Sequence, residues 1–339
     1  VMEGDLHVGQ VRSQDSIELI ADGSILDLYD DAASPVVNVF TGNVTGPATG
    51  DVRLTAGGQI GTAANPLDVE LREGLLISES GTDSYLHARG SLYVEDVHAI
   101  DGDAWIDIDG IAYIERVRAL QGAATLIARD ELLDWRHDVA ADVLANDVTL
   151  VSEQADVGQR FDAIEIDSAV SVAGQVSLQA AGALSVTEVD GSLTLDQVSA
   201  DGGDVVITVL DAVSAGQDLV LISLGSIVAN SGVIRLQAGD NVTLSGTTTG
   251  ARGVQLRSDH RDRDAGTGSV VTLDGAIVAN AIEIRTGHDD DIVQAASQTR
   301  DITVWAGAGN DDVTTGSGDD HVYGEDGVDR LSAGDGDDQ

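Results

Sequence analysis

The chain has 339 residues, of which 59 are acidic and 17 are basic, and its formal net charge is −42. All 17 basic residues are arginine, and cysteine is absent. The charge repels phosphate backbones and anionic lipids, so nucleic acid is not expected as a partner, and the lack of cysteine excludes disulfides and thiolate metal sites. Because 42% of the residues are hydrophobic, the chain is too apolar to be disordered.

Aromatic residues make up only 3% of the chain, which predicts a thin core lined by aliphatic side chains. No apolar run approaches the ~18 residues of a membrane span, and no signal peptide opens the sequence. Val1 is not an initiator and Asp338-Gln339 interrupts a repeat, so we expect the sequence to be a fragment of a longer protein.

Short alternating runs that end in a small residue and a turn dominate the chain. Each alternates apolar and polar residues for about five positions, reaches Ala or Gly, and resumes with an apolar residue, which predicts strand, turn and strand. The clearest runs are IELIADGSI (17–25), VRLTAGGQI (52–60), VSLQAAGAL (176–184), LVLISLGSI (219–227) and IRLQAGDNV (234–242).

Residues 85–102 superpose on residues 105–122 with a shift of 20, which places Tyr85 on Trp105 and Tyr93 on Tyr113. A longer unit also recurs, since residues 52–71 resemble residues 148–166. A fixed period of about 20 residues, built from short strands, is typical of a β-solenoid, in which stacked coils bury a continuous aliphatic column. An antiparallel sandwich is the alternative, but it does not predict this superposition.

Two stretches depart from the pattern. Leu132, Trp135, Val139 and Val143 recur at helical spacing, which favours a short helix within residues 128–147. The segment 258–269 has Ala265 as its one apolar residue and is predicted to be a polar loop that bulges from one coil.

The tail divides from Ala306 into nonapeptides: AGAGNDDVT, TGSGDDHVY, GEDGVDRLS and the incomplete AGDGDDQ. The fourth position is always Gly, the sixth is always Asp, and the eighth is Val or Leu in the three complete copies. Calcium prefers about six oxygen ligands at ~2.4 Å, and glycine allows a backbone turn tight enough to aim carbonyls at an ion. Successive nonapeptides would lie on opposite sides of a flattened coil, so we pair Asp311 with Asp329 and Asp320 with Asp338.

This pattern resembles the calcium-binding RTX (repeats-in-toxin) family. The resemblance implies Ca²⁺ as the bound ion, export in the unfolded state by type I secretion from a Gram-negative cell, and folding outside that cell. The predicted metal-site residues are Gly307, Gly309, Asn310, Asp311, Gly316, Gly318, Asp319, Asp320, Gly327, Asp329, Gly334, Gly336 and Asp338, with Asp290 and Asp291 from a degenerate copy at 282–293. Glu325 replaces a turn glycine and Val328 the usual Asn or Asp, so the third turn is expected to bind calcium weakly.

The residues before the tail resemble, by pattern alone, the β-solenoid segments of large secreted RTX exoproteins and filamentous-haemagglutinin-like adhesins. We therefore expect an all-β chain: a right-handed parallel β-helix over residues 1–300 that continues into an RTX parallel β-roll over 301–339, truncated at its C-terminal end.

The expected function is that of an extracellular or cell-surface structural or adhesive segment, stabilised by calcium. It would self-associate into fibres or a surface layer, or bind a cell-surface or glycan receptor. The alternative is a polysaccharide-active β-helix enzyme, a lyase, hydrolase or epimerase, with an RTX secretion tail. Its candidate residues would be Asp107 and Asp109 with His87, Glu115, Arg116 and Arg118, but acidic outward positions are expected on any rod this acidic, so we expect no enzyme.

Overall fold

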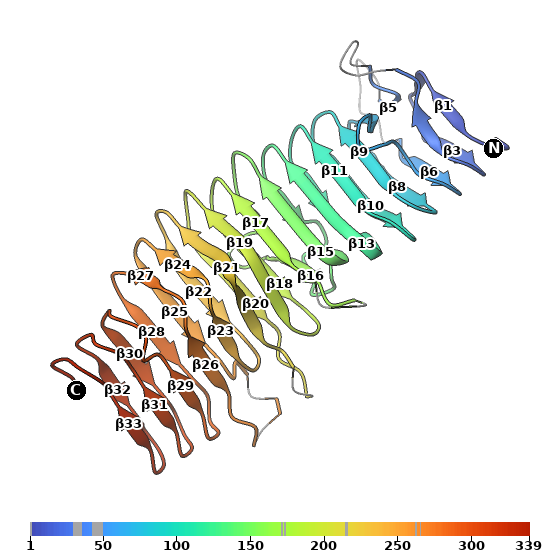
Figure 1. The fold of residues 1–339 in the computed structure, drawn as a ribbon. Coiled ribbons are helices and arrows are strands. Elements are labelled where there is room, and N and C mark those ends of the chain that lie inside the picture. The colour runs from blue at the N-terminus through green and yellow to red at the C-terminus, as the bar shows by residue number, and fades with distance from the viewer. Residues whose placement is uncertain are drawn as a thin grey trace. The chain divides into compact units, whose positions relative to one another are not determined.

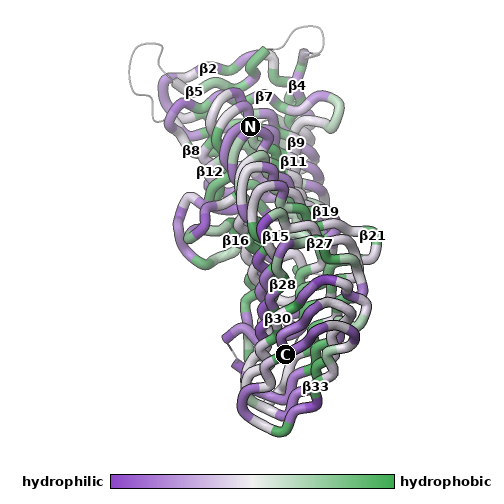
Figure 2. Tube along the Cα trace, turned by 90° about the vertical axis from the view of Figure 1, so that its left-hand side faces the viewer, coloured by the Kyte–Doolittle hydropathy of each residue, from purple (hydrophilic) through white to green (hydrophobic). Residues whose placement is uncertain are grey.

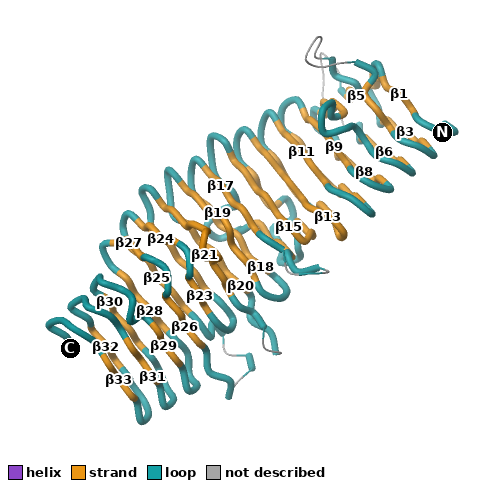
Figure 3. Tube along the Cα trace, viewed as in Figure 1, coloured by secondary structure: helices purple, strands orange, loops and turns teal. Residues whose placement is uncertain are grey.

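The computed structural model describes residues 2–29, 36–42, 50–170, 172, 174–213, 216–261, 263–264 and 266–339. These residues form two compact units, Val1–Gly174 and Gln175–Gln339, which we name unit 1 and unit 2. Both consist of short strands joined by turns, and the described residues contain no helix (Figure 3). Accordingly, none of them belongs to a helix able to cross a membrane.

Unit 1 (blue to green in Figure 1) contains β1 to β16. Their bounds are β1 Leu6–Val8, β2 Val11–Ser13, β3 Ile17–Ala21, β4 Ile25–Asp27, β5 Val39–Thr41, β6 Val52–Ala56, β7 Leu67–Leu71, β8 Leu75–Ser80, β9 Ser84–Ala88, β10 Leu92–Ala99, β11 Ala104–Ile108, β12 Ala112–Ile114, β13 Val117–Ala128, β14 Leu132–Asp134, β15 Val143–Ser152 and β16 Ile164–Asp167.

Unit 2 (yellow-green to red in Figure 1) contains β17 to β33. Their bounds are β17 Val176–Ala180, β18 Leu184–Glu188, β19 Leu193–Ala200, β20 Val205–Val209, β21 Leu219–Ala229, β22 Val233–Gln237, β23 Val242–Leu244, β24 Thr247–Gly250, β25 Gly253–Arg257, β26 Val270–Leu273, β27 Ile277–Ala279, β28 Ile282–Arg285, β29 Ile292–Gln294, β30 Ile302–Trp305, β31 Asp312–Thr314, β32 His321–Tyr323 and β33 Arg330–Ser332.

In both units, each strand pairs in parallel with a strand of the next coil, so the chain winds round an axis as an all-β parallel β-solenoid. Side chains alternate between inside and outside, and Figure 2 shows hydrophobic and hydrophilic residues interleaved along the coils. In unit 1, the inward side chains stack in columns, of which the longest is Leu67, Leu86, Ile106, Leu126 and Leu150. All five are fully buried, so adjacent coils exclude water from one another's inner faces.

The predicted shift of 20 is the observed register in the middle of unit 1. Tyr85 lies opposite Trp105 and Tyr93 lies opposite Tyr113, whose rings stack with centroids 4.3 Å apart. The period is not constant elsewhere, because Ile17 lies opposite Val52 and Val205 opposite Ile234. The strands keep the core columns, whereas the turns between them absorb the insertions.

The helix predicted within residues 128–147 is wrong. Leu132 and Val143 are fully buried on β14 and β15, whereas Val139 is 78% exposed. The carboxylate of Asp134 accepts hydrogen bonds from the N–H groups of Arg136 (2.7 Å) and Asp138 (3.1 Å). Such local bonds compete with those of a helix, and pairing of β14 with β12 completes the coil.

The segment 258–269, predicted to be a polar loop, contains no strand among its described residues and connects β25 with β26. Asp262 and Ala265 lie outside the described residues. Ser258 and Ser269 at its two ends are buried and share a hydrogen bond between their hydroxyls (2.7 Å). The ends of the loop are therefore tied to the core.

Candidate metal centre

The tail has four turns that stack in two pairs. The register shift falls from 20 residues, between β28 and β30, to 18 residues, between β30 and β32. The same change occurs from the β29–β31 pair to the β31–β33 pair. Turn 306–311 therefore lies against turn 324–329, and turn 315–320 lies against turn 333–338. Half a coil is nine residues long here, as the nonapeptide pattern predicts.

The sixth-position aspartates meet in the predicted pairs. The N–H of Asp311 donates to Oδ1 of Asp329 (3.1 Å), and the N–H of Asp320 donates to Oδ1 of Asp338 (2.9 Å). Each bond joins residues 18 apart on neighbouring turns. The side chains of successive copies thus form one ladder on each side of the coil.

The fifth-position side chains form a second, outer pair of ladders. Asp290 Oδ1 accepts from the N–H (2.7 Å) and Nδ2 (3.1 Å) of Asn310, whose Oδ1 accepts from the N–H of Val328 (3.1 Å). On the other side, the N–H of Asp319 donates to Asp301 (2.9 Å), and Asp319 accepts from Asp337 (3.0 Å). Asp301 and Asp337 were not among the predicted site residues, although their 18-residue spacing from Asp319 was a usable signal.

Asp291 differs from the other sixth-position residues. Its Oδ1 accepts from the N–H (2.6 Å) and hydroxyl (2.9 Å) of Ser269, and its Oδ2 accepts from the N–H of Gly287 (2.9 Å). Both oxygens are therefore engaged by protein donors. The structure gives Asp291 a role in joining a turn to the core, and it leaves Asp290 at the edge of the outer ladder.

Asp311 and Asp320 have the character of cation ligands. Both are buried, and Oδ2 of each has no hydrogen-bond partner. Within the described part of the chain, neither forms an ion pair with a basic side chain. Burial raises the pKa of Asp311 to about 6, and nearby carboxylates, Asp291 first, add to the rise. A buried carboxylate without a donor or cation is costly, so these residues fit a bound dication.

The turn glycines are required by close packing between turns. A Cβ on Gly327 would overlap the carbonyl oxygen of Gly309 on the turn before, and a Cβ on Gly316 would overlap that of Gln298. Gly327 also has a φ of 144°, which side chains disfavour. The predicted glycines therefore act by letting backbones approach, as calcium coordination by carbonyls needs.

Residues 305–339 match the family model of the RTX calcium-binding nonapeptide repeat, in four copies. These residues are RTX calcium-binding repeats. Such repeats are typical of extracellular proteins exported by type I secretion. The described residues upstream form the parallel β-solenoid, which the RTX model does not cover. No curated protein and no solved structure matches the chain.

Glu325 stands in the third RTX turn where the repeat has glycine, and its φ is 67°. A side chain in this left-handed region costs about 1–2 kcal/mol. We expect Glu325→Gly to stabilise the tail by about 0.5–1 kcal/mol after the added chain entropy of glycine, and so to lower the calcium concentration at which the tail folds. A calcium titration followed by circular dichroism measures this midpoint. Glu325→Ala is the control, since it removes the carboxylate without relieving the backbone; equal gains from both variants would contradict the explanation.

The residues considered for an enzyme lie in unit 1, where most are tied into ion pairs. His87 Nδ1 lies 2.6 Å from Oδ1 of buried Asp68, and this hydrogen bond raises the pKa of His87. Its Nε2 lies 3.5 Å from Asp109, and Asp107 is its neighbour on β11. Burial raises the pKa of Asp107. Three ion pairs take up the arginines and Glu115: Arg116 with Asp96, Arg118 with Asp96, and Arg136 with Glu115.

Proposed function

We propose that the chain is an extracellular adhesive segment, exported by type I secretion from a Gram-negative cell and stabilised by calcium, and that unit 2 binds an acidic glycan. The observation that carries the proposal is a cleft of about 620 Å³ on unit 2, lined by arginine in a chain that is otherwise strongly acidic. Its lining includes Arg257, His260, Arg261, Arg285 and Trp305.

Parallel pairing explains why these side chains gather. Arg257, Arg285, Trp305 and Tyr323 occupy the same register position on β25, β28, β30 and β32. The guanidinium of Arg285 lies 3.7 Å from the ring centroid of Trp305, and Trp305 stacks on Tyr323 with centroids 5.9 Å apart. These contacts hold the Arg285 side chain in place by cation–π attraction.

Arg257, Arg261 and Arg285 form no ion pair among the residues described. Their charges are thus available to a ligand, unlike those of Arg116, Arg118 and Arg136 in unit 1. Guanidinium groups bind carboxylates and sulfates through paired hydrogen bonds. A polysaccharide that carries such groups suits this cleft, and long-range repulsion from a net charge of −42 would disfavour nucleic acid.

Binding of polygalacturonate to the immobilised chain in calcium tests the proposal, with dextran as the uncharged control glycan. The double variant Arg257→Gln/Arg285→Gln should bind at least about tenfold more weakly, the effect of losing roughly 1.4 kcal/mol of charge-assisted bonding. Arg53→Gln is the matched charge control, because Arg53 is exposed on β6 of unit 1. No binding by the unaltered chain, or equal binding by the double variant, would refute the glycan role.

Two alternatives give different results in parallel measurements. Self-assembly into fibres or a surface layer would appear by electron microscopy of the chain in calcium, without added glycan. A polysaccharide-active enzyme would shorten the glycan, and Asp109→Asn would abolish that activity because Asp109 lies beside His87. We expect binding without turnover.

A further inference from the structure

Unit 1 contains the same buried corner twice. In the first copy, Ile60-Gly61 precedes a four-residue turn closed by pairing of Thr62 with Asn65; in the second, Val157-Gly158 precedes a turn closed by Gln159 and Asp162. Gly61 and Gly158 both have a φ of 64°. This repeat lies within the sequence similarity between residues 52–71 and 148–166.

Three further polar residues correspond in the two corners. Asp27, Asn38 and Asp68 in the first match Asp134, Asp142 and Glu165 in the second. The N–H of Asp68 donates to Oδ1 of Asn38 (2.8 Å), as the N–H of Glu165 donates to Oδ2 of Asp142 (3.0 Å). The backbone N–H of Asn38 bonds to the carbonyl of Asp68 (3.1 Å), and that of Asp142 to the carbonyl of Glu165 (2.8 Å).

The first corner balances its acidic groups with protein partners. The amide of Asn38 donates to Asp27 and to the carbonyls of Val8 (3.0 Å) and Gly9 (3.3 Å). Arg89 lies 2.8 Å from Asp68. His87 forms the second contact to Asp68 described above. One arginine, one histidine and one amide therefore surround the carboxylates of this corner.

The second corner has acids where the first has amides: Asp142 replaces Asn38, and Asp162 replaces Asn65. Asp134 and Asp142 are each 3% exposed and Glu165 is 8% exposed. One ligand oxygen of each lies within 4.8 Å of the others. Over the residues that the structure describes, no basic side chain forms an ion pair with any of the three.

Glu165 provides a second, independent observation. Its Oε2 is buried and has no hydrogen-bond partner, although the side chain belongs to the group whose oxygens converge. Burial raises the pKa of Asp142 and of Glu165, and repulsion among the carboxylates raises both further. The three groups cannot all be ionised in this space without a cation.

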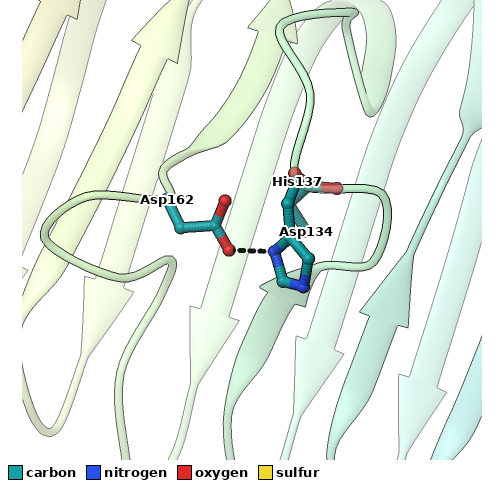
Figure 4. A group of neighbouring side chains, drawn as sticks. All are labelled: Asp134, His137 and Asp162. Carbon is teal, nitrogen blue, oxygen red and sulfur yellow. Dashed lines mark hydrogen bonds and ion pairs between the residues drawn. The ribbon is translucent and has the colours of Figure 1, made fainter.

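We propose that Asp134, Asp142 and Glu165 bind a divalent cation in unit 1, outside the RTX repeats, with calcium as the preferred ion. Oxygen-only ligands are typical of hard cations, and calcium tolerates the irregular geometry of two side chains on strands and one on a connection, whereas magnesium demands a regular octahedron. His137 and Asp162 bond to each other at the rim, next to Asp134 (Figure 4). They enclose the site on its solvent side.

Hydrogen exchange of the full chain, with calcium chloride, with magnesium chloride or with chelator alone, tests the site. We expect β14, β15 and β16 to exchange roughly tenfold more slowly when calcium is tenfold above its dissociation constant. Magnesium at the same concentration should give little protection. Equal exchange with and without calcium, or protection by magnesium alone, would overturn the proposal.

Asp142→Asn converts this corner toward the composition of the first. Its β14 to β16 should exchange slowly in chelator as well, and the calcium response of these strands should disappear while that of residues 305–339 remains. Glu165→Gln is the second variant and should also lose the response. Asp101→Asn, at an exposed carboxylate, should behave as the unaltered chain. A full calcium response in Asp142→Asn would refute the site and leave the RTX tail and the glycan cleft unaffected.

Discussion

Removal of calcium is expected to unfold residues 305–339, while the aliphatic coils upstream keep their strands. The tail has little apolar burial to hold it: Val313 is fully buried, but Leu331 is 45% and Val328 82% exposed. Sites of the extracellular type bind calcium with dissociation constants near 10⁻⁴–10⁻³ M, and each adds about 1.4 kcal/mol at tenfold excess. Several such sites together are enough to decide whether so small an apolar core folds.

Circular dichroism and limited proteolysis with and without chelator measure this effect. We expect the tail to become protease-sensitive in chelator and much of the β signal to persist. Asp311→Asn and Asp320→Asn should each raise the calcium concentration required for folding, since each removes a buried ligand. Asp335→Asn makes the same charge change at an exposed turn position and should have little effect. A tail that stays folded in chelator would contradict the calcium dependence.

Leu126→Ala is expected to destabilise unit 1 by about 2–5 kcal/mol. Leu126 is fully buried between Ile106 on the coil before and Leu150 on the coil after, so the deleted methyl groups leave a cavity that neither neighbour can fill. Each fully buried leucine contributes about 1.5–3 kcal/mol by burial alone, and the cavity adds to the loss.

Denaturant unfolding in calcium, followed by circular dichroism, measures this cost. Leu331→Ala is the control of the same chemistry, and because Leu331 is 45% exposed on β33 its effect should stay well below that of Leu126→Ala. Similar effects of both variants would contradict the claim that stacked aliphatic columns stabilise unit 1.

Periodic features of the molecule could be predicted from the sequence. The pairing of Tyr93 with Tyr113 and of Asp311 with Asp329 follows from shifts of 20 and 18 residues, because parallel coils place equivalent positions side by side. A fixed shift specifies the register, and the alternation of apolar residues specifies the inner face. These are the features that repeated local sequence encodes.

Features that depend on irregular coils could not be predicted. The helix expected near Trp135 failed because pairing of β14 with β12 outweighed a helical spacing of four apolar residues. The convergence of Asp134, Asp142 and Glu165 depends on a connection between β15 and β16 whose length matches no period. The unpaired arginines of unit 2 come from positions 28 and 24 residues apart, which no constant repeat reveals.

A crystal structure of the chain grown in calcium, with anomalous scattering to locate the ions, tests the central claim most directly. The account predicts ions between the turns that carry Asp311 and Asp329, and between those that carry Asp320 and Asp338. Ordered RTX turns without an ion at either pair of aspartates would contradict it.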